Sequence, residues 1–183
     1  MVAWPIAVAA ALLLLAPSLP AAATKPVAPA SVVADANQKL LQAIEQADQH
    51  LLEKALKAGA DPNCRGTNSL PPLLELFRAA TGPLDEDHRD CVALLLEYGA
   101  AVDAKDADQR TPLIQAARIG DLKTVQMLVE AEATVIARDR FSKSALFYAV
   151  DANRRDIVVY LATHGDLVSL TIRERKALGQ PLQ

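Results

Sequence analysis

The densest group of side chains able to do chemistry lies in residues 85–91. His88 and Cys91 are three residues apart and would share one face of a helix, and four carboxylates accompany them, at Asp85, Glu86, Asp87 and Asp90. Imidazole, thiolate and carboxylate groups together suggest a divalent metal, but four ligands at the spacing of a structural site are not present. Acidic residues are also favoured in the first turn of any helix. We therefore expect a helix start here, with no metal and no cofactor.

Catalytic patterns are not visible elsewhere in the sequence. Three serines, Ser142, Ser144 and Ser169, lack the flanking glycines that would expose a nucleophile on a tight turn. No Ser/His/Asp arrangement, glycine-rich phosphate loop or paired-carboxylate site stands out. We therefore expect a protein that is not an enzyme.

Composition and charge narrow the class of protein further. The chain has 183 residues, a formal net charge of −3 and only 4% aromatic residues. Alanine and leucine dominate, which suits small, closely packed helices rather than a β-sandwich. The overall charge gives no reason to expect nucleic acid or a membrane surface as the partner.

The first 23 residues form a separate segment without charged side chains. Their apolar centre, residues 6–16, has the length of the hydrophobic region of a signal peptide, and alanines 21–23 supply small residues for cleavage. We interpret residues 1–23 as a signal peptide and expect a periplasmic or secreted protein. An inner-membrane anchor stays open as the alternative, because no Lys or Arg precedes the apolar centre and residues 2–23 could barely span a bilayer.

The remainder of the chain repeats itself with a period of 33 residues. Ser144 follows Thr111 by this distance, and each opens a three-residue segment that ends in leucine. Residues 135–139 match residues 102–106 in the same register. Each copy holds two amphipathic runs, which are too short to bury an apolar face alone and gain stability by stacking on their neighbours.

Local signals place two helices in each copy. Thr111 and Ser144 can cap a first helix with a side-chain hydroxyl, and Pro112 is tolerated in the first turn. Second helices are predicted to end in a left-handed turn, at Gly59, Gly99, Glu132 and Gly165. Glu132 is the one residue of this set that is not glycine, at a cost of roughly 1 kcal/mol if the left-handed turn persists.

This period, with a Thr-Pro-Leu entry and the endings KAGADPN (57–63) and EYGAAVD (97–103), resembles the ankyrin repeat. The resemblance implies an all-α ankyrin-repeat solenoid of about four helix-turn-helix units with short β-hairpin connections. It covers residues 37–169, with units at about 37–63, 66–99, 106–132 and 139–165. Residues 24–36, rich in proline and alanine, are predicted to be a linker, and residues 170–183 a C-terminal cap or tail.

Repeat geometry bears on the two cysteines, Cys64 and Cys91. In an oxidising compartment a disulfide between them is one interpretation. The other is that Cys91 is a small core residue early in a second helix, while Cys64 lies at the base of a hairpin beyond the roughly 7 Å Cα separation that a disulfide allows.

The resemblance assigns a binding face, made of the loop tips and the late positions of the first helices. Eight cationic side chains fall there, at Arg65, Arg78, Lys105, Arg110, Arg118, Arg138, Arg140 and Lys143, against two anionic ones, Asp108 and Asp151. A local balance of +6 in a protein of net charge −3 favours an acidic partner. The alternative is that loop tips are exposed and exposed residues are often charged.

We predict that eight residues of this face contact the partner, with Ile119 and Phe141 as apolar anchors: Arg78, Arg110, Arg118, Ile119, Arg138, Arg140, Phe141 and Lys143. An insert around residues 80–89, with Leu84 and His88, is a second candidate contact. The equal alternative is a loop insertion that the fold tolerates and that has no function.

The resulting hypothesis is an exported, monomeric and non-catalytic interaction module that binds an acidic protein on a basic concave face. The chain also resembles small periplasmic ankyrin proteins of Gram-negative bacteria. That resemblance implies either a housekeeping partner or an immunity protein that neutralises a secreted toxin. A membrane-tethered scaffold is the alternative if the N-terminal segment stays attached. Neither nucleic acid nor, after signal cleavage, a membrane is expected as a partner.

Overall fold

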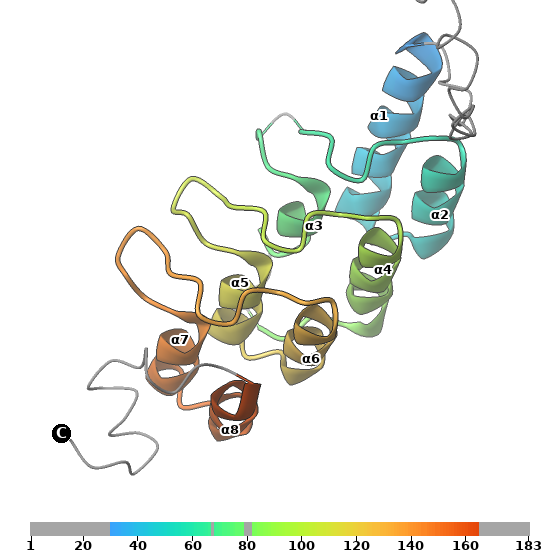
Figure 1. Ribbon diagram of the computed structural model, residues 1–183. Helices are drawn as coiled ribbons and strands as arrows, with labels where there is room; N and C mark the ends of the chain where they lie inside the picture. The colour runs from blue at the N-terminus through green and yellow to red at the C-terminus, as the bar shows by residue number, and fades with distance from the viewer. Residues whose placement is uncertain (1–29, 67, 79–81, 165–183) are drawn as a thin grey trace, which may run out of the picture.

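The computed structural model describes residues 30–66, 68–78 and 82–164. Within them the chain forms eight helices, which make four pairs stacked side by side (Figure 1). The first helices of the pairs are α1 (Ala30–Gln46), α3 (Pro72–Glu75), α5 (Pro112–Ile119) and α7 (Ala145–Asp151). The second helices are α2 (Gln49–Lys57), α4 (Glu86–Glu97), α6 (Leu122–Glu130) and α8 (Arg155–His164). The predicted all-α stack is confirmed.

The N-terminal boundary of the fold differs from the prediction. The sequence predicts a linker up to residue 36, but α1 begins at Ala30. Ala36 is buried in the core, and the Asn37 side-chain oxygen accepts a hydrogen bond from the Asp61 amide at 2.8 Å. Pro29 is the last proline before Pro62, so residues 30–36, three of them alanine, can begin the helix directly after it. The predicted signal peptide, the remaining linker and the C-terminal tail lie outside the described residues.

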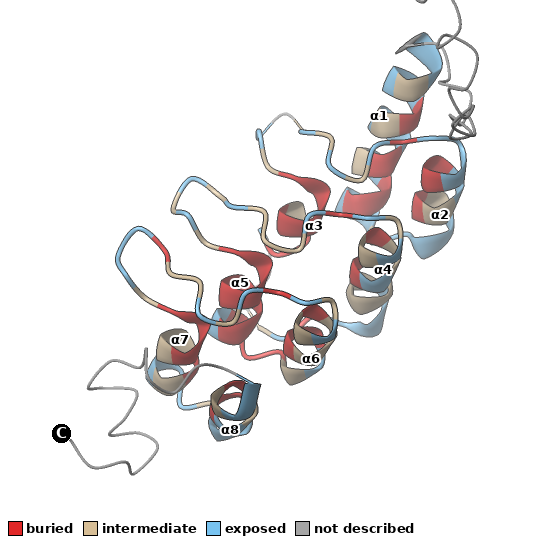
Figure 2. Cartoon of the chain, viewed as in Figure 1, coloured by how far each residue is buried: buried red, intermediate tan, exposed pale blue. Residues whose placement is uncertain are grey.

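Buried residues gather where the helices of one unit face those of the next (Figure 2). Each second helix contributes one apolar stripe, for example Cys91, Val92 and Leu95 of α4. Between α5 and α7 the fully buried side chains include small ones, Ala116, Ala117 and Ala149. Small residues let these two first helices pack closely along their lengths.

Side-chain caps start five of the eight helices within the described residues. Thr111 accepts from the Ile114 amide at 3.4 Å and Ser144 from the Phe147 amide at 3.1 Å, as predicted. An aspartate caps three of the second helices, at Asp48, Asp85 and Asp121. Each cap satisfies an amide that has no partner inside its own helix.

The helix ends also follow the sequence prediction. Gly59 (φ 94°), Gly99 (φ 86°) and Glu132 (φ 64°) all have left-handed backbone conformations. Gly165, the fourth predicted turn residue, lies outside the described residues. Glu132 is therefore held in a conformation that glycine adopts without steric cost.

Replacing Glu132 by glycine is expected to raise the free energy of unfolding by about 1 kcal/mol, because the left-handed turn loses its Cβ penalty. Urea denaturation monitored by circular dichroism measures the change. Glu130→Gly is the matched control, since Glu130 is the last residue of helix α6 and glycine weakens a helix. Destabilisation by both substitutions would contradict the assignment of strain to Glu132.

The connections between units are tight turns rather than strands. We name them loop A (66–70), loop B (106–110) and loop C (139–143). In each, the first residue donates its amide to the carbonyl of the fifth, and the fourth residue donates its amide to the carbonyl of the first. The fourth residue has a positive φ in all three loops, at Ser69, Gln109 and Ser142. Among the described residues, strand-like pairing is limited to one isolated bridge between Arg138 and Ser144.

The described part of the insert, residues 82–89, is attached to the third unit through Leu84 and Arg89. Leu84 is buried, and its amide donates to Asp121 Oδ2 at 3.1 Å. The Arg89 guanidinium donates to the Leu84 carbonyl and lies 3.6 Å from the same Asp121 oxygen. Leu84 is therefore a core residue, and of the two candidate contacts in the insert only His88 keeps accessible surface.

Candidate partner-binding surface

Loops A, B and C project on the side of the first helices, away from the second helices (Figure 1). The tip of loop C carries an exposed aromatic ring. Phe141 is 52% exposed, and the Arg140 guanidinium lies 4.7 Å from the centre of its ring. An arginine stacked on an exposed aromatic ring offers both an apolar contact and hydrogen-bond donors to a partner.

Loop B supports this tip. The Arg140 amide donates to the Asp108 carbonyl at 3.0 Å, and the Arg140 guanidinium pairs with the Asp108 carboxylate at 3.0 Å. Arg110 pairs with the same carboxylate at 2.8 Å. The backbone of loop C is thus tied to loop B, so Phe141 is held in place before any partner arrives.

Asp139 organises loop C from inside. Its Oδ1 accepts from the amides of Phe141 and Lys143, each at 2.9 Å, and its Oδ2 accepts from the Tyr148 hydroxyl at 2.6 Å. Arg110 Nε lies 3.7 Å from the same Oδ2. The Asp139 side chain is inaccessible to solvent, so these donors replace its water shell.

The ionisation of this group follows from its surroundings. Burial alone would raise the pKa of Asp139, but the hydrogen bonds from Tyr148, Lys143 and Phe141, with the charge of Arg110, outweigh burial and lower it. Burial and the hydrogen bond to Asp139 raise the pKa of Tyr148. Asp139 is therefore a carboxylate at neutral pH and Tyr148 is its donor.

Asp106 holds the corresponding place in loop B. Its Oδ1 accepts from the amides of Asp108 and Arg110, and its Oδ2 accepts from the Gln115 side chain at 2.8 Å. Loop A has Gly66 at this position. The 33-residue spacing of Asp106 and Asp139 is visible in the sequence, and it could have identified both as loop-forming residues.

These carboxylates revise the charge of the surface. Adding Asp106, Asp139, Glu75 and Glu45 to Asp108 and Asp151 gives six anionic side chains against the same eight cationic ones. The local balance falls from +6 to +2. The basic character is concentrated where cations remain exposed, as at Arg140, and not spread evenly over the face.

The predicted contact residues separate into three groups. Ile119 is buried, with 7% of its surface exposed, so its role as an apolar anchor is wrong: the last residue of α5 points into the core. Arg110 and Arg138 support the loops, Arg138 by donating to the Ser142 carbonyl at 2.9 Å. The other five present accessible surface in loop C, on α5 or just after α3: Arg140, Phe141, Lys143, Arg118 and Arg78.

Several side chains of this last group already have contacts within the protein, and Lys143 has two of them. Its ammonium lies 4.9 Å from the centre of the Phe147 ring and 5.6 Å from that of Tyr148. Arg118 donates to the Gln115 side chain at 3.0 Å, and Arg78 pairs with Glu75. Arg140 and Phe141 therefore form the most prominent contact pair among the predicted residues.

The side chains that suggest metal chemistry do not come together. The His88 ring nitrogen Nδ1 and the His88 amide both contact Asp85 Oδ1, at 2.5 and 2.9 Å, in the cap of α4. These bonds, the amide's first, lower the pKa of Asp85. Cys91 instead lies in the core. Within the described ranges, no three His, Cys, Asp or Glu side chains group closely enough to hold a metal ion.

Both cysteines are free thiols. Burial, with smaller contributions from nearby aspartates, raises the pKa of the Cys64 and Cys91 thiols to about 11. Only a small fraction of either is thiolate at neutral pH, which does not suit a nucleophile or a metal ligand. The core interpretation of Cys91 is confirmed.

Comparison with known proteins agrees with the geometry. The sequence profile described as "Ankyrin repeats (3 copies)" matches residues 40–139 and 76–171, which together make up most of the chain. The chain belongs to the ankyrin-repeat family. Ankyrin repeats form protein–protein interaction modules and are generally non-catalytic.

Curated relatives are similar to the chain over part of its length. The chain is similar to a fowlpox virus protein named as an ankyrin repeat protein (31% identical over 105 residues, 56% of this chain and 15% of that protein). It is also similar to neurogenic locus notch homolog protein 1 of Xenopus laevis (33% over 110 residues, 60% and 4%) and to the serine/threonine-protein kinase VIK of Arabidopsis thaliana (38% over 74 residues, 40% and 17%). The chain spans at most 17% of the length of these relatives.

No helix within residues 30–66, 68–78 and 82–164 has the length and apolar character needed to cross a membrane.

Proposed function

We propose that the chain is an exported interaction module that captures an acidic partner protein with the tip of loop C. The Arg140–Phe141 pair carries this proposal. Phe141 is a large apolar side chain left exposed although the fold buries most others, and Arg140 is fixed above it by loop B. A pre-positioned aromatic and arginine at one tip is the composition of a binding hot spot.

The acidic character of the partner follows from the charges near Phe141. Arg140 lies over the Phe141 ring and Lys143 follows in the same loop. Arg118 lies exposed on α5, and Arg78 lies exposed three residues after the end of α3. The carboxylates of loops B and C are occupied by amides and guanidinium groups of the loops themselves. Arg140 keeps 56% of its side chain exposed although it pairs with Asp108, so the tip still presents donors outward, which complement a carboxylate of the partner.

Export is proposed from the sequence of residues 1–23, whose apolar centre and small residues suit a cleaved signal peptide. Subcellular fractionation of the native host and the mass of the mature N-terminus test it. A mature chain starting near Thr24 in the periplasm supports export. A chain that keeps residues 1–23 and sediments with membranes would instead identify a tethered scaffold.

The capture test uses the full-length chain with a C-terminal tag, expressed in its native host. Changing Arg140 and Phe141 to alanine together is expected to reduce the recovered partner at least about tenfold, because both anchors of the tip are lost. Both side chains are more than half exposed, so the melting temperature should change by less than about 2 °C. Quantitative mass spectrometry of the captured proteins measures the effect.

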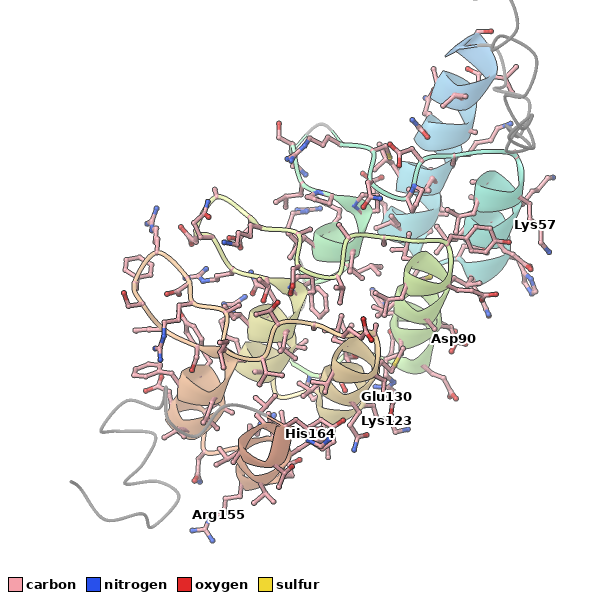
Figure 3. The ribbon with its side chains drawn as sticks, in the orientation of Figure 1. Lys57, Asp90, Lys123, Glu130, Arg155 and His164 are labelled. Atoms are coloured by element: carbon pink, nitrogen blue, oxygen red, sulfur yellow. The ribbon has the colours of Figure 1, made fainter. Side chains whose placement is uncertain are left out.

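The matched control changes Arg155 and Val159 of helix α8 to alanine, which also removes one exposed arginine and one exposed apolar side chain (Figure 3). This variant should capture the partner as the wild type does. Equal capture by all three proteins would exclude the loop C tip. A partner without an acidic surface, held unchanged at high salt, would contradict the electrostatic part of the proposal.

Toxin immunity is the alternative use of such a module. The two roles differ in one property of the captured protein, namely whether it is toxic in the absence of this chain. Immunity predicts that the captured protein is toxic when produced alone and harmless when produced with this chain, and that the Arg140–Phe141 double variant fails to protect. Co-expression of the captured protein with each variant separates the two roles.

A further inference from the structure

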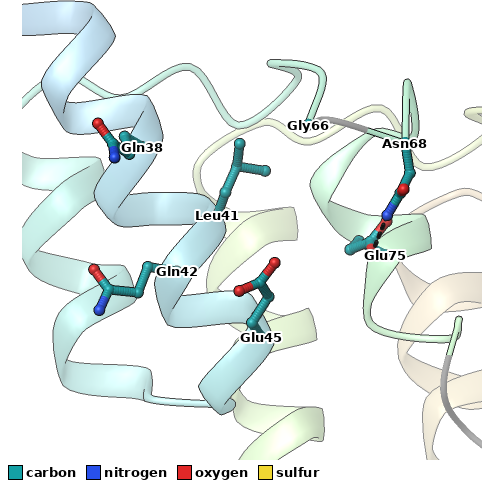
Figure 4. A pocket seen from close by; sticks show the side chains of 7 residues that line it. All are labelled: Gln38, Leu41, Gln42, Glu45, Gly66, Asn68 and Glu75. Atoms are coloured by element: carbon teal, nitrogen blue, oxygen red, sulfur yellow. Dashed lines mark hydrogen bonds between the residues drawn. The ribbon is translucent and has the colours of Figure 1, made fainter.

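A second feature of the loop side lies near the other end of the stack. A cavity of about 290 Å³ opens between α1 and loop A (Figure 4), and its polar lining side chains are Gln38, Gln42, Glu45, Asn68 and Glu75. A smaller cavity of about 100 Å³ shares Glu45 and Glu75 with it and extends to His88. We name the two together the α1 trough.

The trough exists because the second unit departs from the repeat. Its first helix, α3, is a single turn of four residues after Pro71, whereas α5 and α7 have eight and seven. The longer α1 is therefore not covered along its whole length, and it contacts α3 much less than α5 contacts α7. Gly66 approaches α1 closely, since a Cβ there would lie 3.3 Å from the Leu41 side chain. The gap is thus a property of the fold at this joint.

The trough is acidic and incompletely neutralised. The exposed Glu45 carboxylate forms no hydrogen bond or ion pair with the residues that the structure describes. Glu75 is mostly covered and accepts from the Asn68 side chain at 3.2 Å and from Arg78. Leu41, half-buried against the core, adds an apolar wall (Figure 4). An apolar wall with a carboxylate and amide oxygens suits a long side chain with an aliphatic stem and a cationic end.

We propose that the α1 trough receives an arginine side chain of the partner protein. The guanidinium would pair with Glu45 and donate to the amide oxygens around it, while its stem lies against Leu41. Arginine fits better than lysine, because its planar fork can serve a carboxylate and neighbouring amide oxygens together. This inference rests on the proposed function and extends it. The binding surface then has an anionic end, the α1 trough, and a cationic end, the loop C tip. The partner accordingly carries an arginine that pairs with Glu45 and an acidic group that pairs with Arg140.

The test does not need the partner. N-acetyl-arginine methylamide is titrated into the full-length ¹⁵N-labelled protein, and backbone amide shifts are followed by NMR. Millimolar probe is expected to shift Gly66, Asn68 and residues of α1 near Glu45. The citrulline analogue, which has the same shape without the charge, should shift them much less. Glu45→Gln should reduce the arginine-induced shifts at least about threefold, as expected when an exposed ion pair is lost.

Glu130→Gln is the matched control, since Glu130 is an exposed glutamate on α6, on the side of the second helices (Figure 3). It should leave the shifts unchanged. Equal shifts from arginine and citrulline probes, or shifts insensitive to Glu45→Gln, would overturn the proposal. Shifts at the trough that appear on raising the protein concentration without probe would show a second copy of this chain there, and would also overturn it.

Partner capture by the Glu45 variant and by the Arg140–Phe141 variant tests the trough proposal and the tip proposal separately. If capture depends on Arg140 and Phe141 but not on Glu45, the trough proposal fails and the function stands. If the arginine probe binds at Glu45 but the loop C variant captures normally, the tip proposal fails and the trough stands.

Discussion

Replacing Asp121 by alanine is expected to lower the free energy of unfolding by about 3 kcal/mol, because it leaves several donors in the core without an acceptor. Asp121 is 3% exposed and accepts from the Leu84 amide, the Thr124 amide and the Thr124 hydroxyl. It also faces the largely covered Arg89 guanidinium. One carboxylate therefore caps α6 and attaches the insert of the second unit to the third.

Asp48→Ala is the control for this prediction. Asp48 caps α2 in the same way, by accepting from the Leu51 amide at 3.0 Å, but it is exposed. Its loss should cost about 1 kcal/mol, the value of a helix cap alone. Urea unfolding of both variants gives the comparison. Similar losses from the two would show that the bonds to Leu84 and Arg89 add nothing to the cap.

Asp139→Asn is expected to destabilise the protein by about 3 kcal/mol at pH 7, since a neutral amide weakens every bond that the buried carboxylate accepts. Asp106→Asn is the matched change in loop B, where the side chain is only half-buried, and it should cost less. Capture through the loop C tip should fall with Asp139→Asn as well, because the Phe141 amide is one of the donors that fix the tip.

The effect of Asp139→Asn should depend on pH. The pKa of Asp139 is lowered in the folded protein, so its contribution to stability is present above its unfolded pKa of about 3.9 and is lost as pH falls through the folded value. The difference between wild type and variant should be constant from pH 7 to about pH 5 and shrink below about pH 4. A difference that grows on acidification would contradict the assignment of an ionised Asp139.

The fold could be predicted because its signals are local and periodic. The helix caps at Thr111 and Ser144 and the left-handed conformation of Glu132 were predictable, because each depends only on residues nearby in the sequence. The start of α1 was not predictable in the same way. Composition made residues 30–36 resemble the proline-containing segment before them, and only the burial of Ala36 between helices shows that they belong to the fold.

The binding surface could be predicted only in part. The position within the repeat correctly placed Arg140 and Phe141 on a loop tip. It wrongly placed Ile119 on the exposed side of α5, whereas the side chain is buried. Counting charges by position also missed the carboxylates that the loops need for their own structure, such as Asp139. The α1 trough depends on the length of α3 relative to α1, which the period of the sequence does not reveal.

The short α3 also affects how cooperatively the stack unfolds. Helix-to-helix packing is extensive between α5 and α7 and between α2 and α4, but sparse between α3 and α5, so the joint between the second and third units relies on the bonds of Asp121 to Leu84 and Arg89. In a linear array, cooperativity passes only through neighbours, so loss of these bonds would divide the chain into two blocks of two units. The trough lies in one block and the loop C tip in the other. A partner that bridges them would convert two separately opening blocks into one, and amide hydrogens of both would then exchange together.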